Sequence, residues 1–239
     1  MIKKILSFVL IVCISTINSY AFGSTSHFNL TWTAIINTKL LDKFELKDRL
    51  DIRDVLLQSC NFPDEKERDY MFYKHFYDPA ECFEGLNGGN NAMNLMNCHY
   101  KEAKKNWEID RNKSLKELGC AIHYLQDMCC VAHEVSWFEN LLYVAILFLK
   151  HQLYEKAVDE YFKTNFYTLI EKYKDFDFRK NTIDINGTVI GYAHYLKSTF
   201  KSKYQWSILH EIDIDEVGTA HQATCKLIYL FFKEVGIEL

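Results

Sequence analysis

Apolar residues recur along most of the chain at the three- and four-residue spacing of an α-helix, not in the strict alternation of a half-buried β-strand. Leu30 and Ala34 show this spacing near the start of the chain, and Leu118, Ile122 and Leu125 repeat it near the middle. The pattern predicts helices over residues 27–43, 46–59, 99–109, 112–131, 136–163, 164–175, 187–202 and 213–235.

The segment 61–97 interrupts this helical pattern. It contains both prolines of the chain and a run rich in glycine and asparagine, which favour turns, so it is predicted to be an extended loop. The 239 residues include only 2 Pro and 9 Gly, while 49% are hydrophobic and 15% are aromatic. No internal repeat, low-complexity tract or shift in composition marks a second domain. We therefore expect an all-α protein that forms a single compact multi-helix domain.

Residues 1–21 have the pattern of a secretory signal peptide. A start with two lysines is followed by an apolar run over 5–14, about half the roughly 20 residues that a membrane-spanning helix needs. Ser19 and Ala21 supply the small residues that precede a cleavage site. We expect cleavage after Ala21, which leaves a mature catalytic domain over 22–239 in a secreted or periplasmic protein.

Removal of this leader makes the net charge, −4 for the whole chain, more negative, because two lysines leave and no acidic residue does. An acidic surface repels phosphate backbones, so no nucleic acid partner is expected. The apolar run over 141–149 is too short to cross a bilayer, and we expect a monomer without a transmembrane helix in the mature chain. Lipid attachment at Cys13 is the less favoured alternative, since the small residue that normally precedes such a site is missing.

The mature chain keeps seven cysteines, an odd number in a compartment that permits disulfides. None of their spacings matches a paired Cys-x-x-Cys zinc module. Cys120, Cys129 and Cys130 lie in an apolar helical stretch, where small buried thiols are common. We expect structural or unpaired thiols, and a bridge between Cys82 and Cys98 stays open.

Histidine and carboxylate residues are paired at helical spacing in two places. His123 and Asp127 are four residues apart, as are His151 and Glu155, so each pair lies on one face of a helix where it can grip an ion. A single pair of this kind is more often a solvated contact, which stabilises a helix by a few tenths of a kcal/mol. Two such pairs in one chain favour the metal-binding interpretation.

Two further histidines strengthen this interpretation. His133 follows His123 by ten residues, about 15 Å along a continuous helix, so a cluster of several ions fits the spacing better than a single ion. His75 opens the run His-Phe-Tyr-Asp-Pro inside the predicted loop. Histidine and carboxylate are common metal ligands, so the sequence predicts a cluster of metal ions.

At these positions the chain resembles the zinc-dependent phospholipase C family, which includes bacterial phosphatidylcholine-hydrolysing enzymes and is related to the fungal single-strand nucleases. The motif residues occur in the order of the family over most of the mature chain: His27 at the head of a helix, Pro63-Asp64, His75-Phe76-Tyr77-Asp78-Pro79, His123-Tyr124-Leu125-Gln126-Asp127, His133, and His151 with Tyr154-Glu155. One His-x-x-x-Asp motif would be weak evidence, whereas the complete order identifies the chain as a member.

The resemblance implies three zinc ions. The first would be held by His75, His123, Asp64 and Asp127, the second by His133, His151 and Glu155, and the third by His27 and Asp127, with Asp127 bridging. The resemblance further implies that the amino group and carbonyl of the mature N-terminal residue, here Phe22, complete the third site. Cleavage of the leader would then assemble that site, because an amide nitrogen inside the precursor cannot coordinate the ion.

The implied reaction is hydrolysis of the glycerol–phosphate bond of phospholipids such as phosphatidylcholine at a membrane surface. The products are diacylglycerol and a phosphorylated head group. Clustered zinc ions neutralise phosphate oxygens and activate water, and Asp64 is the catalytic candidate that orients or deprotonates this water. The aromatic residues at 72, 73, 76 and 77 could surround a choline group, although aromatics at this spacing more often belong to a core.

Two alternatives stay open. A related zinc nuclease is favoured by the short interval from Phe22 to His27, and is disfavoured by the acidic balance and by Glu155. A non-catalytic member of the fold is kept open by the interval of 18 residues between His133 and His151, which contains an additional apolar helix.

Overall fold

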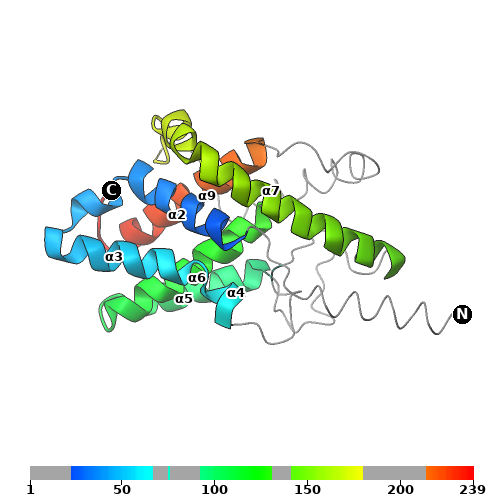
Figure 1. The fold of residues 1–239 in the computed structure, drawn as a ribbon. Coiled ribbons are helices and arrows are strands. Elements are labelled where there is room, and N and C mark those ends of the chain that lie inside the picture. The colour runs from blue at the N-terminus through cyan, green and yellow to red at the C-terminus, as the bar shows by residue number, and fades with distance from the viewer. Residues whose placement is uncertain (1–22, 67–74, 76–91, 131–140, 180–213) are drawn as a thin grey trace, which may run out of the picture.

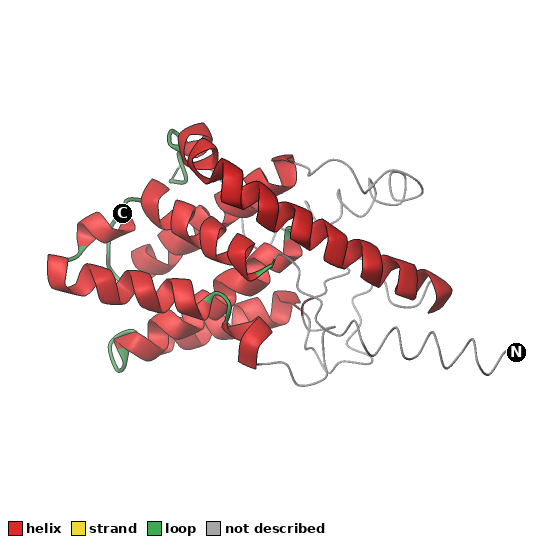
Figure 2. Cartoon of the chain, in the orientation of Figure 1, coloured by secondary structure: helices red, strands yellow, loops and turns green. Residues whose placement is uncertain are grey.

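The computed structural model describes residues 23–66, 75, 92–130, 141–179 and 214–239. Every regular element in these ranges is a helix: α2 (Ser24–Asn37), the 3-10 helix η1 (Leu40–Lys43), α3 (Leu46–Ser59), α4 (Phe62–Lys66), α5 (Ala92–Asn106), α6 (Arg111–Met128), α7 (Leu141–Tyr173) and α9 (Ile214–Glu234). Figure 2 shows this helical architecture. The expected all-α fold is confirmed, and the boundaries of a single domain over 22–239 stay a prediction.

Helix α6 lies in the middle of the bundle (Figure 1). Asp110 caps the start of α6, because its side chain accepts a hydrogen bond from the Lys113 N–H. All residues of α6 from Leu118 to Met128 are buried. Helix α5 packs along it most extensively, and α3 and α9 cover other sides. A helix enclosed in this way buries polar residues as well as apolar ones, so α6 can place a polar site in the protein interior.

Helix α3 approaches α6 closely at a glycine. A Cβ atom added at Gly119 would lie 2.0 Å from the Ser59 Oγ, a distance that no side chain could occupy without displacing α3. Ser59 turns its hydroxyl back to the Val55 carbonyl, which keeps the end of α3 compact. This close packing brings the backbone of Cys60, directly after α3, next to the middle of α6.

The start of the chain follows the predicted pattern with one interruption. Helix α3 covers the predicted range 46–59, but the predicted helix 27–43 is divided into α2 and η1. Thr38 returns its hydroxyl to the Ala34 carbonyl (Oγ1–O 2.8 Å), and Lys39 adopts a left-handed conformation with φ of 53°. These two residues end α2 because a left-handed residue cannot continue the α-helical hydrogen-bond ladder.

Several other boundaries differ from the sequence prediction, and the short helix α4 forms inside the predicted loop. Helix α5 starts at Ala92, inside the predicted loop, because Met93, Met96 and Ala103 form a buried stripe. Helix α7 is continuous where two helices were predicted to meet after 163. Thr164 and Asn165 hydrogen-bond to carbonyls of the preceding turn, so these polar residues continue the helix and do not end it. The predicted helix 187–202 lies outside the described residues.

Among the described residues, none of the helices combines the length and the apolar character that crossing a bilayer requires. Cys120, Cys129 and Cys130 are buried, as expected. Cys82 lies outside the described residues, so a bridge between Cys82 and Cys98 stays open.

Candidate metal centre

Helix α6 presents His123 and Asp127 on one face, with His123 Nε2 3.2 Å from Asp127 Oδ2. Both side chains are fully buried. The His123 Nδ1 lies 2.8 Å from the carbonyl oxygen of Cys60. A carbonyl only accepts hydrogen bonds, so Nδ1 carries the proton and Nε2 turns its lone pair toward Asp127. The close packing of α3 on α6 thus fixes both the orientation and the tautomer of this histidine.

Helix α2 contributes His27, which is also fully buried. Its Nδ1 lies 2.7 Å from the Gln126 Oε1, and the Gln126 amide nitrogen donates to the hydroxyls of Thr31 and Thr224. This arrangement leaves Oε1 as the acceptor and points His27 Nε2 at Asp127 Oδ1, 3.3 Å away. The His27 ring also stacks on His123, with ring centroids 4.0 Å apart.

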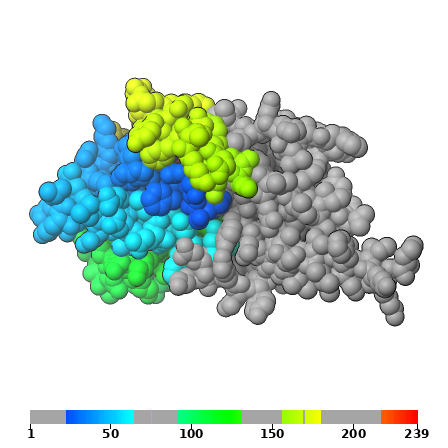
Figure 3. Space-filling model, viewed as in Figure 1, coloured from blue at the N-terminus to red at the C-terminus, as the bar shows by residue number. Residues whose placement is uncertain are grey.

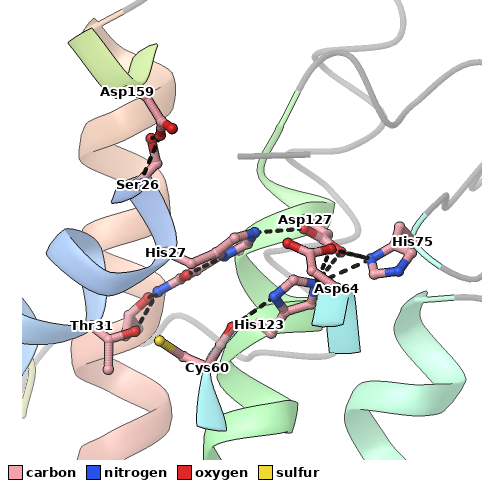
Figure 4. A network of polar contacts seen from close by, with 11 residues as sticks. Ser26, His27, Thr31, Cys60, Asp64, His75, His123, Asp127 and Asp159 are labelled. Atoms are coloured by element: carbon pink, nitrogen blue, oxygen red, sulfur yellow. Dashed lines mark hydrogen bonds and ion pairs between the residues drawn. The ribbon is translucent and has the colours of Figure 1, made fainter. Parts of the chain in front are cut away.

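Asp64, in α4, and His75 complete the cluster from the other side of Asp127. His75 Nδ1 lies 2.7 Å from Asp127 Oδ2 and 3.1 Å from His123 Nε2. Asp64 Oδ1 lies 3.5 Å from His123 Nε2 and 3.9 Å from His75 Nδ1. Figure 4 shows that the five side chains, which come from distant parts of the sequence, point toward one another.

The cluster contains two overlapping groups of potential metal ligands: His27, His123 and Asp127, and Asp64, His75 and His123. Within each group the ligand atoms all lie within 4.8 Å of one another. Asp127 belongs to the first group and also contacts the second, because its Oδ1 faces His27 and its Oδ2 faces His75. Within the described part of the chain this Oδ1 makes no hydrogen bond although it is buried. A carboxylate placed in this way can bridge two cations.

The charges of the cluster are balanced by protons when no metal is bound. Burial acts to lower the pKa of His27, but contact with Asp127 outweighs burial and raises this pKa to about 9. The pKa of His75 is raised in the same way, against the effect of burial, by the Asp127 charge. Burial lowers the pKa of His123 to about 4. Burial also disfavours ionised Asp127, yet the neighbouring histidines hold its pKa well below the usual range.

The structure therefore brings together five of the nine residues predicted from the sequence. His151 and Glu155 fall in α7, but their side chains are not among those described. Phe22 and His133 lie outside the described residues. The second zinc site and the N-terminal ligand stay predictions.

Sequence reasoning missed the groups that orient the histidines. Gln126 lies inside the recognised motif, but its role becomes apparent only from its contacts with His27 and two threonine hydroxyls. The carbonyl of Cys60 is a main-chain group that every residue possesses, so no pattern of side chains could have identified it. Both are contacts between segments far apart in the sequence.

A family model described as zinc dependent phospholipase C matches residues 19–205. The fold is similar to that of the alpha toxin from Clostridium absonum, with a TM-score of 0.60 and 19% sequence identity over 88% of this chain and 64% of the toxin. The Clostridium perfringens alpha-toxin of avian strain SWCP gives a TM-score of 0.47 and 16% identity, over 88% of this chain and 61% of that one. The chain thus spans less than two thirds of either toxin. No curated protein matches it.

Proposed function

This chain belongs to the zinc-dependent phospholipase C family, and from that premise we propose that it is an exported zinc-dependent phosphodiesterase. Its substrate is a phospholipid at a membrane surface, and it cleaves the bond between glycerol and phosphate. The observation that carries the proposal is the buried cluster in which three histidines and Asp64 gather around Asp127. The reaction consumes one water molecule and one phospholipid, and it releases diacylglycerol and a phosphorylated head group.

The residues of the cluster fit zinc. Imidazole nitrogen and carboxylate oxygen are ligands that zinc takes, and each group supplies three of the four ligands of a tetrahedral zinc ion. The hydrogen bonds to Cys60 and Gln126 hold the non-ligating nitrogens of His123 and His27, as outer contacts do in zinc proteins. Two buried aspartates also need positive charge beside them, and metal binding would release the protons that now supply it.

Two of the three ions would lie on the two sides of Asp127. Asp64, His75, His123 and Asp127 would hold one ion, and His27 and Asp127 another, completed by the amino group and carbonyl of Phe22 after removal of the leader. His133, His151 and Glu155 would hold the third. When bound, zinc supplies Lewis-acid activation of water and of the phosphodiester near neutral pH.

Asp64 is the member of the cluster best placed to act on water. His27, His123 and Asp127 are fully buried, whereas Asp64 and His75 are 5% and 8% exposed. We infer that substrate and water approach from the side of Asp64 and His75, the two members of the cluster that are not completely buried. In this position the Asp64 carboxylate can orient the attacking water and accept its proton.

The experiment uses protein that begins at Phe22. Bound zinc is measured by elemental analysis, and hydrolysis is assayed on phosphatidylcholine, on other phospholipids and on single-stranded DNA, with and without a chelator. We expect zinc in the protein and phospholipid hydrolysis that the chelator abolishes. Protein without zinc, or with DNA cleavage and no phospholipid cleavage, would contradict the proposal.

A further inference from the structure

Asp159, on α7, contacts the first turn of α2 across 133 positions of sequence. Its Oδ1 accepts a hydrogen bond from the Ser26 N–H (2.9 Å) and another from the Ser26 hydroxyl. Ser26 is completely buried by this contact although it lies in the first turn of a helix. Figure 3 shows the start of α2, in dark blue, directly against the yellow-green part of α7.

This contact replaces a cap that α2 lacks. Its N-cap residue is Gly23, which has no side chain to accept hydrogen bonds, and the first turn contains no acidic residue. The Asp159 carboxylate supplies a side-chain acceptor for the Ser26 N–H, which it shares with the Gly23 carbonyl (2.8 Å), and a negative charge at the N-terminal end of the helix dipole. The fit is tight, because a Cβ atom at Gly23 would lie 2.1 Å from Asp159 Oδ2.

The contact also lies next to the candidate metal centre. Ser26 directly precedes His27, whose Nε2 faces Asp127 (Figure 4). On α7, Asp159 follows His151 by eight residues and Glu155 by four, so the three positions share one helix face. The hydrogen bonds from Ser26 to Asp159 thus join the turn that carries one ligand to the helix that carries two predicted ligands.

We propose that Asp159 is a positioning residue for the metal centre. It holds the turn from Gly23 to His27 against α7, and it thereby sets the separation between His27 and the α7 ligands. Asp159 acts through Ser26 and touches no reacting group. This inference rests on the proposed function, because it assumes that His27, His151 and Glu155 bind zinc.

The test compares Asp159→Ala with Asp159→Asn and with a matched control, Glu160→Gln. Glu160 is the next residue of α7, and it is exposed and paired with Lys163, so its variant removes the same charge from the same helix without touching α2. For each protein, bound zinc is measured across a chelator titration, kcat and KM are measured on phosphatidylcholine vesicles, and the stability of the metal-free protein is measured by urea unfolding.

We expect Asp159→Ala to weaken retention of zinc and to lower kcat, each by about tenfold, with KM little changed. Asp159→Asn keeps an oxygen that can accept from Ser26 and should recover most of the loss. Glu160→Gln should behave as wild type. A lower stability of metal-free Asp159→Ala, with zinc retention and kcat at wild-type values, would overturn the proposal, since a purely structural cap would act in that way.

Ser26→Ala decides the question if Asp159→Ala does not fold. It removes only the hydroxyl, and we expect a smaller loss of zinc retention in the same direction; wild-type retention would overturn the proposal. The outcomes also separate this inference from the proposed function. Wild-type protein that binds zinc but hydrolyses no phospholipid contradicts the function alone, and the zinc retention of the variants still decides the role of Asp159. Wild-type protein that binds no zinc overturns both.

Discussion

Individual side chains in the candidate metal centre are oriented by neighbours that are not among the proposed ligands. Gln126 accepts from His27 Nδ1 and donates to Thr31 and Thr224, so three contacts fix one amide. The Cys60 carbonyl accepts a hydrogen bond from His123 Nδ1 and so orients the His123 ring. The sequence identifies the candidate ligands by their residue types, their spacing and their order in the family motif, whereas these orienting groups depend on tertiary contacts that no spacing encodes.

Replacing Gln126 with leucine tests this orientation. Gln126→Leu keeps the approximate volume but removes the acceptor for His27 Nδ1. We expect zinc to bind about 10-fold to 100-fold more weakly, as is typical for loss of an outer contact. Equilibrium zinc titration of the mature protein measures the effect. Gln58→Leu, the same change at an exposed position of α3, should leave the affinity unchanged; equal affinities for wild type and Gln126→Leu would contradict the account.

Asp64 gives a second prediction at the residue scale. Asp64→Asn should lower turnover of phospholipid by about 100-fold or more, because the amide cannot accept a proton from water. Most of the bound zinc should remain, since His75, His123 and Asp127 keep their ligand atoms. Steady-state kinetics and elemental analysis measure the two effects together. Asp42→Asn, at a largely exposed position, is the control, and near-wild-type turnover of Asp64→Asn would exclude the proposed catalytic role.

Among the elements, helix boundaries were predicted well where a stripe of buried residues and a stop signal agree. Helix α3 has the predicted bounds, and α9 lies within one residue of its prediction. The sequence prediction ends one helix at 163 and begins another at 164, whereas α7 is continuous there. Thr164 and Asn165 are residue types that can end a helix, but their side chains here bond to carbonyls of the same helix. Local propensity cannot reveal whether a polar side chain ends a helix or bonds to a carbonyl of the same helix and continues it.

The packing of α3 on α6 gives a prediction at the scale of elements. Gly119→Ala places a methyl group against Ser59 and forces α3 away from α6. We expect the free energy of unfolding to fall by about 1–3 kcal/mol, and zinc to bind more weakly because the Cys60 carbonyl moves from His123. Urea unfolding and zinc titration measure these effects. The double variant Gly119→Ala/Ser59→Gly relieves the overlap and should recover zinc affinity; no recovery would mean that this close approach does not position the carbonyl.

At the scale of the whole molecule, α9 is joined to α2 by a buried histidine. His221 Nδ1 donates to the Thr33 hydroxyl (3.0 Å), and its Nε2 accepts from the Asn37 amide (3.1 Å). These bonds need the neutral imidazole. Burial lowers the pKa of His221 to about 4, from an ordinary value of 6.5. The first and last described helices are thus held together by a group that acid can disrupt.

The pH dependence of stability follows from this shift. Between pH 6.5 and about 4 the unfolded chain binds a proton at His221 that the folded protein does not, so the folded state loses stability as the pH falls through this range. This change in the protonation of His221 lowers the free energy of unfolding by about 3 kcal/mol between pH 6.5 and about 4. Above pH 6.5 that stability is fully present. Urea unfolding of metal-free wild type and His221→Gln should therefore show a shallower pH dependence for the variant. Parallel pH profiles would contradict this assignment.

We expect the buried cluster around Asp127 to bind zinc. Anomalous diffraction at the zinc edge, from crystals of protein that begins at Phe22, tests it most directly. We predict anomalous density on both sides of Asp127, one peak beside His27 and one between Asp64, His75 and His123. Crystals in which zinc is supplied but neither position shows anomalous density, so that His27 and His75 keep their protons against Asp127, would contradict it.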